Sequence, residues 1–163
     1  MIEIRNDIEK IVNELLESDK HITISFAESL TGGLLSSTLT KIPGVSKIFS
    51  GSIVAYSNEC KVNILNVPLD VILKNGAVSK ECAYHMAKGL FNITGSNISI
   101  SATGVAGPSL EENKPIGLVF IGFIINGIEP HVFEKHFKGS RIEIQNQVTN
   151  FVFEKIKEYS KTL

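Results

Sequence analysis

The hydroxyl groups best placed for chemistry stand in two glycine-rich turns of the sequence. Ser29 and Thr31 belong to the turn 29–33, which directly follows an apolar run that predicts a buried strand. Thr103 opens the turn 103–107 after a second run of this kind. In open α/β sheets, ligands bind in the crevice outside the carboxyl ends of the strands. We therefore expect the two turns to meet in one cleft, where glycine amides at a helix start could bind a phosphate or an oxyanion.

Lys61 is the residue that could act as a base for Ser29. The sequence lacks the GxSxG pattern, and its four histidines fall on separate elements or on opposite strand faces, so a Ser-His-Asp triad is not indicated. A lysine can take this role when burial lowers its pKa enough to leave a neutral amine. Arg141 lies in the first turn of the predicted last helix, where a cation is unfavourable unless an anion compensates it. It is either a plain surface arginine or a phosphate ligand.

The composition is that of an ordinary globular chain without a strong electrostatic field. The 163 residues suit one domain, 1–163, and 16 basic against 17 acidic residues leave a formal charge of −1. This balance provides no broad basic surface, so no nucleic-acid or membrane partner is expected. The N-terminal segment 1–20 carries charges every few residues, which argues against a signal peptide or membrane span and predicts a cytoplasmic protein.

Metal and cofactor chemistry is not indicated either. No cluster of carboxylates or histidines has the spacing of a metal site, and neither glycine-rich turn fits the dinucleotide or P-loop pattern. We therefore expect no metal and no cofactor. The two cysteines, Cys60 and Cys82, are interpreted as reduced structural residues. Glu111, Glu112 and Lys114 are interpreted as parts of a solvated loop.

The elements that must position these residues follow from hydrophobic periodicity and capping signals. Ser79 is a predicted N-cap of a helix that ends near Gly95, and Ser140 with Glu143 forms a capping box. Asn126-Gly127 favours a hairpin turn, so antiparallel pairing joins an α/β sheet whose two faces helices can cover. The predicted helices are 8–16, 34–39, 58–67, 80–95 and 141–159, and the predicted strands are 22–27, 52–56, 98–103, 116–125 and 131–137.

Five ordered motifs then resemble one known family along nearly the whole chain. They are AESLTGG at 27–33, YSNECK at 56–61, GAVS at 76–79, GVAGP at 104–108 and KPIG at 114–117. In this order they resemble the CinA C-terminal domain family. The resemblance implies a single three-layer α/β/α domain with a mixed, partly antiparallel sheet. It also implies metal-independent deamidation of nicotinamide mononucleotide to nicotinate mononucleotide and ammonia.

The same resemblance implies which residues do this chemistry. It makes Ser29 the nucleophile and Lys61 its base, with Tyr56 and Thr103 orienting groups or shuttling protons. Backbone amides near 31–33 would hold the oxyanion. Ser46, in the PGxS segment, matches a further family serine, so the choice of nucleophile between Ser29 and Ser46 stays open.

The binding residues implied for the pyridine nucleotide come mainly from the turns and the last helix. Arg141 would pair with the ribose phosphate. The remaining members of this predicted set are Thr31, Gly32, Gly33, Ser46 and Gly104. Similar proteins often self-associate, so a homodimer or a higher homo-oligomer is expected.

Departures from the family pattern keep alternatives open. The segment 109–113 is about one residue shorter than its usual counterpart and lacks a Gly-Gly pair, Leu118 stands where a threonine is common, and Ser140 replaces an aspartate beside Arg141. A catalytically silent pyridine-nucleotide binding domain is therefore the main rival to an active amidohydrolase. A third reading, an interaction domain for DNA uptake, finds no basic patch or aromatic ladder.

Overall fold

The protein is described here by a computed structural model covering residues 6–163. Residues 1–5, the beginning of the predicted domain 1–163 and of the charged N-terminal segment, lie outside the described residues. The elements in chain order are α1 (Asn6–Glu17), β1 (Ile24–Glu28), α2 (Leu34–Thr40), the 3-10 helix η1 (Val45–Lys47), β2 (Phe49–Val54), α3 (Asn58–Asn63), α4 (Leu69–Asn75), α5 (Lys80–Thr94), β3 (Ile98–Gly104), β4 (Leu118–Ile125), β5 (His131–His136) and α6 (Arg141–Ser160).

One five-stranded mixed sheet forms the centre of the fold, with strand order β2-β1-β3-β4-β5. β1 pairs in parallel with both β2 and β3, whereas β4 runs antiparallel to β3 and β5 antiparallel to β4. The residues Asn126 and Gly127, which the sequence marked as a hairpin turn, have φ values of 48° and 74° in the β4–β5 connection. The predicted mixed, partly antiparallel sheet is confirmed.

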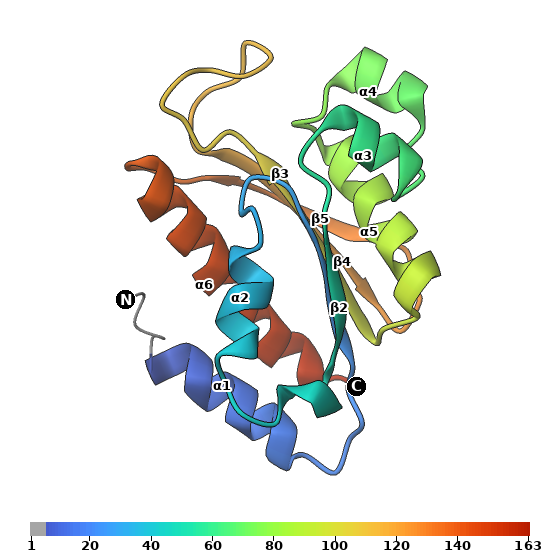
Figure 1. The fold of residues 1–163 in the computed structure, drawn as a ribbon, viewed down its shortest axis with the longest axis vertical. Helices are drawn as coiled ribbons and strands as arrows, with labels where there is room; N and C mark the ends of the chain where they lie inside the picture. The colour runs from blue at the N-terminus through green and yellow to red at the C-terminus, as the bar shows by residue number, and fades with distance from the viewer. Residues whose placement is uncertain (1–5) are drawn as a thin grey trace.

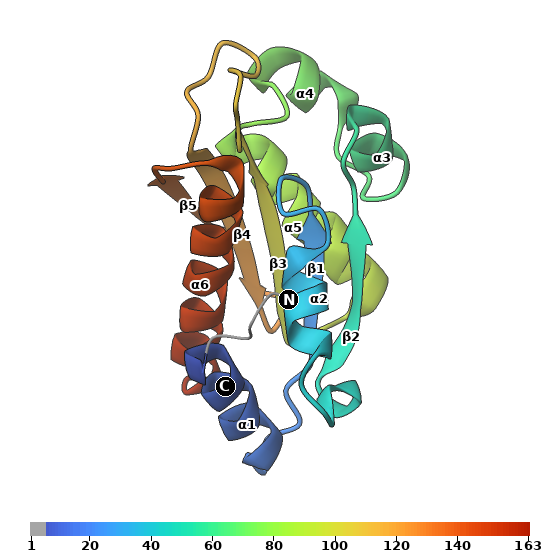
Figure 2. The ribbon, with the colours of Figure 1, turned by 60° about the vertical axis from the view of Figure 1, so that its left-hand side comes forward.

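Helices cover both faces of the sheet, which makes three layers (Figure 1). α1, α2 and α6 lie on one face, and α5 lies on the other with α3 and α4 (Figures 1 and 2). Phe26 on β1 and Phe153 on α6 meet in the core between the sheet and the first helical layer, with ring centroids 6.3 Å apart. On the opposite side, Met86 and Leu90 of α5 are fully buried in a second apolar cluster. The predicted three-layer α/β/α architecture is therefore confirmed.

The region between β2 and α5 differs most from the sequence prediction. β2 begins at Phe49, not at residue 52, and its pairing with β1 ends at Val54. The predicted helix 58–67 ends at Asn63, and α4, which the sequence analysis did not predict, follows it. The large apolar residues Leu69 and Leu73 of α4 are exposed, so the helix shows no clear buried stripe in the sequence.

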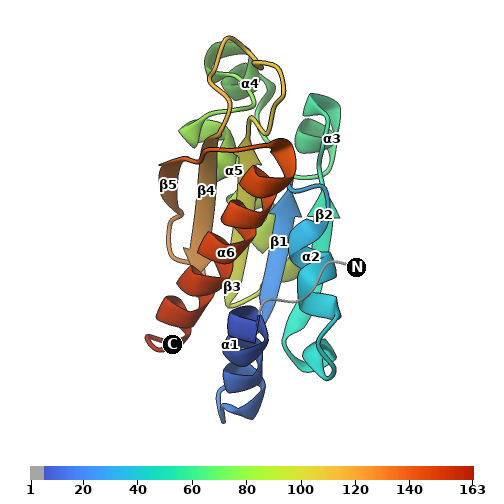
Figure 3. The same cartoon turned by 90° about the vertical axis from the view of Figure 1, so that its left-hand side faces the viewer.

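The connections around β1 create the crevice that an α/β sheet offers to a ligand. From β1 the chain passes through α2 to β2 on one face, then returns through α5 on the other face to β3. The carboxyl ends of these three parallel strands therefore share one edge of the sheet at a point where the topology reverses. This edge lies at the top of the molecule in Figure 3, below the segment that joins β3 to β4.

Among residues 6–163, no helix is long and apolar enough to cross a membrane.

Candidate active site

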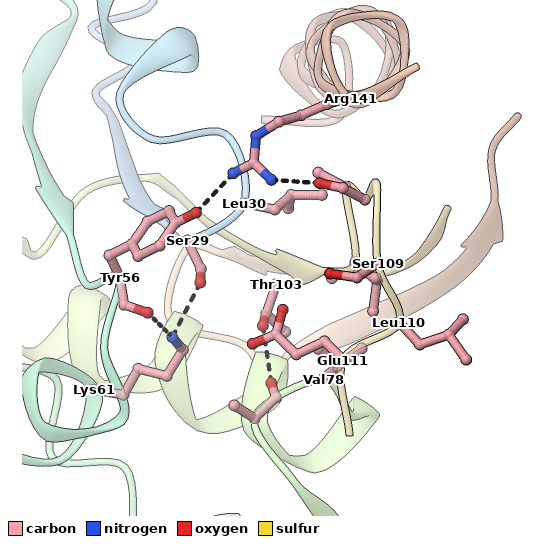
Figure 4. A pocket seen from close by; sticks show the side chains of 15 residues that line it. Ser29, Leu30, Tyr56, Lys61, Val78, Thr103, Ser109, Leu110, Glu111 and Arg141 are labelled. Atoms are coloured by element: carbon pink, nitrogen blue, oxygen red, sulfur yellow. Dashed lines mark hydrogen bonds between the residues drawn. The ribbon is translucent and has the colours of Figure 1, made fainter. Parts of the chain in front are cut away.

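A pocket opens at this carboxyl edge and brings together segments far apart in the sequence (Figure 4). Its wall combines Ser29 after β1, Lys61 on α3, Thr103 at the end of β3 and Arg141 at the start of α6. The other lining residues are Leu30, Tyr56, Ala77, Val78, Gly104, Val105, Ala106, Gly107, Ser109, Leu110 and Glu111. The two glycine-rich turns 29–33 and 103–107 therefore both reach one cleft, as the sequence analysis expected.

Ser29 and Lys61 are in direct contact in the depth of this pocket. Lys61 Nζ lies 3.0 Å from Ser29 Oγ, although 32 residues separate them in the chain. Only 1% of Lys61 and 8% of Ser29 is exposed. The short helix α3 begins at the N-cap Ser57, whose hydroxyl accepts a hydrogen bond from the Cys60 amide, and this turn directs Lys61 back under the end of β1. The structure thus places a hydroxyl nucleophile beside a buried amine.

Burial lowers the pKa of Lys61 from its ordinary value, because the ammonium form loses its hydration. Electrostatic interaction with the acidic groups of Cys82, Glu111, Glu112 and Cys60 works to raise the pKa of Lys61, but the net shift is downward. A lowered pKa increases the fraction of neutral amine near neutral pH. This is the protonation state that a general base requires.

The partners of Lys61 fit a neutral amine well. Besides Ser29 Oγ, Nζ contacts the carbonyl oxygens of Ala55 at 2.9 Å and Tyr56 at 3.0 Å. A neutral amine has two N–H bonds and one lone pair. If the two N–H bonds donate to these carbonyls, the lone pair is directed at Ser29, whose O–H can donate to it. The two carbonyls that follow β2 therefore orient the amine for proton abstraction.

A second buried ionisable residue, Glu28, shapes the turn that carries Ser29. The Glu28 side chain is fully buried at the end of β1, and its Oε2 accepts hydrogen bonds from Thr31 Oγ1 and from the amides of Gly33 and Leu35. Its Oε1 accepts three more, from the Ser36 amide, Ser36 Oγ and Ser52 Oγ. The sequence alone did not indicate this role of Glu28. The signal was a glutamate at the end of an otherwise apolar buried strand.

Two of the amides expected as oxyanion donors, those of Gly32 and Gly33, donate hydrogen bonds within the protein. The Gly33 amide donates to Glu28 Oε2 at 3.0 Å, and the Gly32 amide donates to the Ser29 carbonyl at 3.0 Å. Thr31, Gly32 and Gly33 are also absent from the pocket wall. These residues form the turn that presents Ser29. Of the described residues, none accepts a hydrogen bond from the amide of Leu30, which does line the pocket beside Ser29.

Ser46 is wrong both as a nucleophile and as a binding residue. It lies exposed on η1, directly before β2. Because β1 and β2 are parallel, with Ile24 beside Phe49 and Glu28 beside Val54, the start of β2 lies at the opposite end of the sheet from Ser29. A five-residue strand spans about 16 Å. Ser29 is thus the serine in contact with Lys61.

The remaining predicted site residues all reach the pocket. Tyr56 contacts Lys61 through its carbonyl, whereas its hydroxyl accepts a hydrogen bond of 2.7 Å from Arg141. Arg141 also donates to the Gly107 carbonyl at 2.7 Å, so it is fixed without the aspartate that Ser140 replaces. Thr103 Oγ1 donates to the Ala77 carbonyl at 2.8 Å, and Gly104 forms part of the wall.

The segment 109–114 is largely exposed, as predicted for a solvated loop, but its side chains also anchor it to the rest of the protein. The Glu112 carboxylate accepts hydrogen bonds from the amides of Ala77 at 2.7 Å and Val78 at 3.1 Å. Burial works to raise the pKa of Glu112, but these amides and Lys114 outweigh it, and the net shift is downward. Lys114 Nζ donates to the Val78 carbonyl. The loop is therefore fastened to the connection between α4 and α5.

Metal-binding groups are not assembled in the described part of the chain. Residues 6–163 contain no group of three or more histidine, cysteine, aspartate or glutamate side chains that could hold an ion. Both cysteines are free thiols, and Cys82 is fully buried. Burial raises the pKa of the Cys82 thiol to about 11, which keeps it protonated beside Lys61.

Comparison with known proteins identifies the family of this chain. Residues 5–160 match the model of the CinA C-terminal domain. The chain belongs to this family. It is 50% identical over 143 residues to a CinA-like protein of Dictyoglomus thermophilum and 50% identical over 140 residues to one of Petrotoga mobilis. These matches cover 87% and 85% of this chain but only 34% of each relative, so the chain spans about a third of their length.

Solved structures of CinA-family proteins share the fold. The crystal structure of the competence/damage inducible protein CihA from Agrobacterium tumefaciens matches with a TM-score of 0.90 and 29% identity, covering 98% of this chain and 99% of that one. A competence-damaged protein (CinA) superfamily protein from Escherichia coli matches with a TM-score of 0.84 and 26% identity, covering 95% and 92% of the two chains.

The CinA motifs noted in the sequence converge on the pocket. Segments 27–33, 56–61, 76–79 and 104–108 each contribute at least one residue to its wall. The fifth motif, 114–117, instead supplies Lys114, which fastens the loop 109–114. These five segments, which are scattered along the sequence, are thus parts of one site.

Proposed function

We propose that this chain hydrolyses the carboxamide of nicotinamide mononucleotide to nicotinate mononucleotide and ammonia, without a metal ion, through Ser29 and Lys61. The observation that supports this most is the contact of 3.0 Å between Ser29 Oγ and the buried amine of Lys61. A serine paired with a neutral lysine is suited to acyl transfer from an amide. The choice of substrate rests on the resemblance of the sequence motifs to the CinA C-terminal domain family.

Acylation begins when neutral Lys61 takes the proton of the Ser29 hydroxyl as Oγ attacks the carboxamide carbon. The carbonyl oxygen becomes an oxyanion, for which the amide of Leu30 is the donor adjacent to the nucleophile. The resulting ammonium of Lys61 then gives its proton to the departing nitrogen. The C–N bond breaks, ammonia leaves, and the nicotinoyl group remains as an ester on Ser29.

Deacylation repeats these steps with water. Lys61 accepts a proton from the water as its oxygen attacks the ester carbon, and the tetrahedral intermediate collapses with cleavage of the bond to Ser29 Oγ. The proton on Lys61 returns to Oγ, which restores the enzyme and releases nicotinate mononucleotide. The carbonyls of Ala55 and Tyr56 hold the Lys61 amine in place throughout both half-reactions.

Removing the nucleophile tests this proposal directly. We expect wild-type protein to release ammonia from nicotinamide mononucleotide in the presence of a chelator, and Ser29→Ala to lower the rate at least about 10³-fold. Ser46→Ala is the matched control, because it removes an exposed serine at the far end of the sheet and should leave the rate unchanged. The measurement is coupled detection of ammonia, with circular dichroism as the check on folding.

A different result would favour the silent binding domain. If wild-type protein binds the nucleotide but releases no ammonia, the proposed hydrolysis is refuted. If Ser29→Ala remains active while folded, the proposed nucleophile is refuted instead.

Arg141 is proposed to bind the phosphate of the nucleotide. Hydrogen bonds to Gly107 and Tyr56 use two of the five N–H donors of its guanidinium, which leaves donors for an anion. We expect Arg141→Met to raise the KM for nicotinamide mononucleotide about tenfold or more, because a charge-assisted contact is lost. The KM for nicotinamide riboside, which has no phosphate, should change much less. Equal changes for the two substrates would contradict this role.

A further inference from the structure

The pocket contains one carboxylate whose role the proposed reaction leaves open, that of Glu111. Of the described residues that line the pocket, Glu111 is the only acidic one. Its side chain points into the pocket on the side of Thr103, while Arg141 lies across the cavity (Figure 4). The wall therefore carries a negative group on one side of the cavity and a positive group on the other.

The backbone of Glu111 is held in a defined place. Its carbonyl accepts a hydrogen bond of 2.8 Å from the Lys114 amide, and its neighbour Glu112 is bound to the amides of Ala77 and Val78. Lys114 Nζ also donates to the Asn75 carbonyl at 2.8 Å. These contacts fix both sides of the turn, so the Glu111 carboxylate is directed at the pocket by a fastened loop.

The Glu111 carboxylate has no hydrogen-bond or ion-pair partner within residues 6–163. It also lies close enough to Lys61 to favour the ammonium form, which works against proton abstraction from Ser29. A cation bound beside Glu111 would neutralise this unfavourable field. The charges of the pocket wall thus suit a ligand with a positive group near Glu111 and a negative group near Arg141.

We propose that Glu111 is a specificity-determining residue that selects substrates with a cationic, quaternised pyridine ring over substrates with a neutral ring. This inference rests on the proposed function for the identity of the ring. In nicotinamide mononucleotide the ring bears the reacting carboxamide and a positive charge, and the phosphate provides the negative group. The two charges of such a substrate match the order of Glu111 and Arg141 in the pocket.

Binding to a variant that cannot react isolates this effect. The Ser29→Ala protein and the Ser29→Ala, Glu111→Gln protein are compared by calorimetric titration with nicotinamide mononucleotide and with its reduced form, whose dihydropyridine ring is neutral. We expect the added Glu111→Gln change to weaken binding of the cationic form about tenfold and to alter binding of the reduced form less than about twofold. Equal losses for both ligands, or no loss for either, would overturn the inference.

Glu112→Gln, in the same Ser29→Ala background, is the matched control. It is a neighbouring glutamate in the same loop, but its carboxylate faces the amides of Ala77 and Val78 instead of the cavity. This substitution should loosen the loop and weaken the binding of both ligands by the same factor. Selective loss of the cationic ligand in this control would show that loop anchoring, not the charge of Glu111, determines the preference.

The pH profile of the otherwise wild-type enzyme gives a second readout. Glu111→Gln should shift the rise of kcat/KM to lower pH, because Lys61 then faces only Cys60, Cys82 and Glu112 as ionisable acidic groups. An unshifted profile would contradict the proximity of Glu111 to the base. Ring-selective binding without any ammonia release would refute the proposed function alone, whereas release without ring selectivity would refute this inference alone.

Discussion

Lys61→Met is expected to lower the rate of ammonia release at least about 10³-fold while the protein stays folded. Methionine is similar to lysine in length and suits the fully buried site. It cannot accept the proton of Ser29, so the hydroxyl remains a weak nucleophile. The measurement is the single-turnover rate at saturating nucleotide, which separates this chemical step from binding. A rate within tenfold of wild type would remove Lys61 from the mechanism.

The pH dependence of the wild-type rate is part of the same prediction. Below the lowered pKa of Lys61 the amine is protonated and cannot accept a proton, so the rate should rise with pH and level off above that pKa. Because burial lowers the pKa, the midpoint should lie below the ordinary lysine value of 10.5. Lys47→Met, on the exposed helix η1, is the matched control and should leave both rate and profile unchanged.

Glu28→Gln is expected to destabilise the fold by about 3–5 kcal/mol. The buried carboxylate accepts six hydrogen bonds, three at each oxygen. Glutamine replaces one acceptor oxygen by an NH2 group, which would face either the Ser36 amide or the amides of Gly33 and Leu35. Either orientation sets donors against donors in a site without water access.

Denaturant unfolding of Glu28→Gln measures this loss, and Glu143→Gln is its matched control. Glu143 also accepts hydrogen bonds at a helix start, in the capping box of α6, but there the carboxylate is exposed. Its replacement should lower the free energy of unfolding by only about 1 kcal/mol. A Glu28→Gln protein as stable as Glu143→Gln would mean that the buried acceptor contributes little.

Much of the site could be predicted from strand ends and motifs. Ser29 follows one apolar strand and Thr103 lies at the end of another, which predicted that both lie at one edge of a parallel sheet, and the structure has them there. Arg141 was correctly placed in the first turn of the last helix. The contact between Ser29 and Lys61 came from family resemblance, because spacing along the chain gives no distance between two side chains.

The errors share a physical origin in contacts between distant segments. Ser46 and Ser29 are both serines in glycine-containing turns, and only the parallel register of β1 and β2 separates them to opposite ends of the sheet. Glu112 binds the connection that follows α4. The sequence did not predict α4, because its large apolar residues are exposed and do not form a regular buried face. Hydrophobic patterns report which residues are buried, but they do not report hydrogen bonds across loops.

The pocket draws its functional groups from both helical layers, since Lys61 lies on α3 at one face and Arg141 begins α6 at the other. A nucleotide in contact with both Lys61 and Arg141 would connect the two helical layers. Any ligand that binds only the folded form stabilises it by mass action, by about 2.7 kcal/mol at a concentration one hundred times its dissociation constant. Occupancy of this pocket is therefore linked to the thermal stability of the whole domain, so melting temperature can serve as a gauge of ligand binding that needs no turnover.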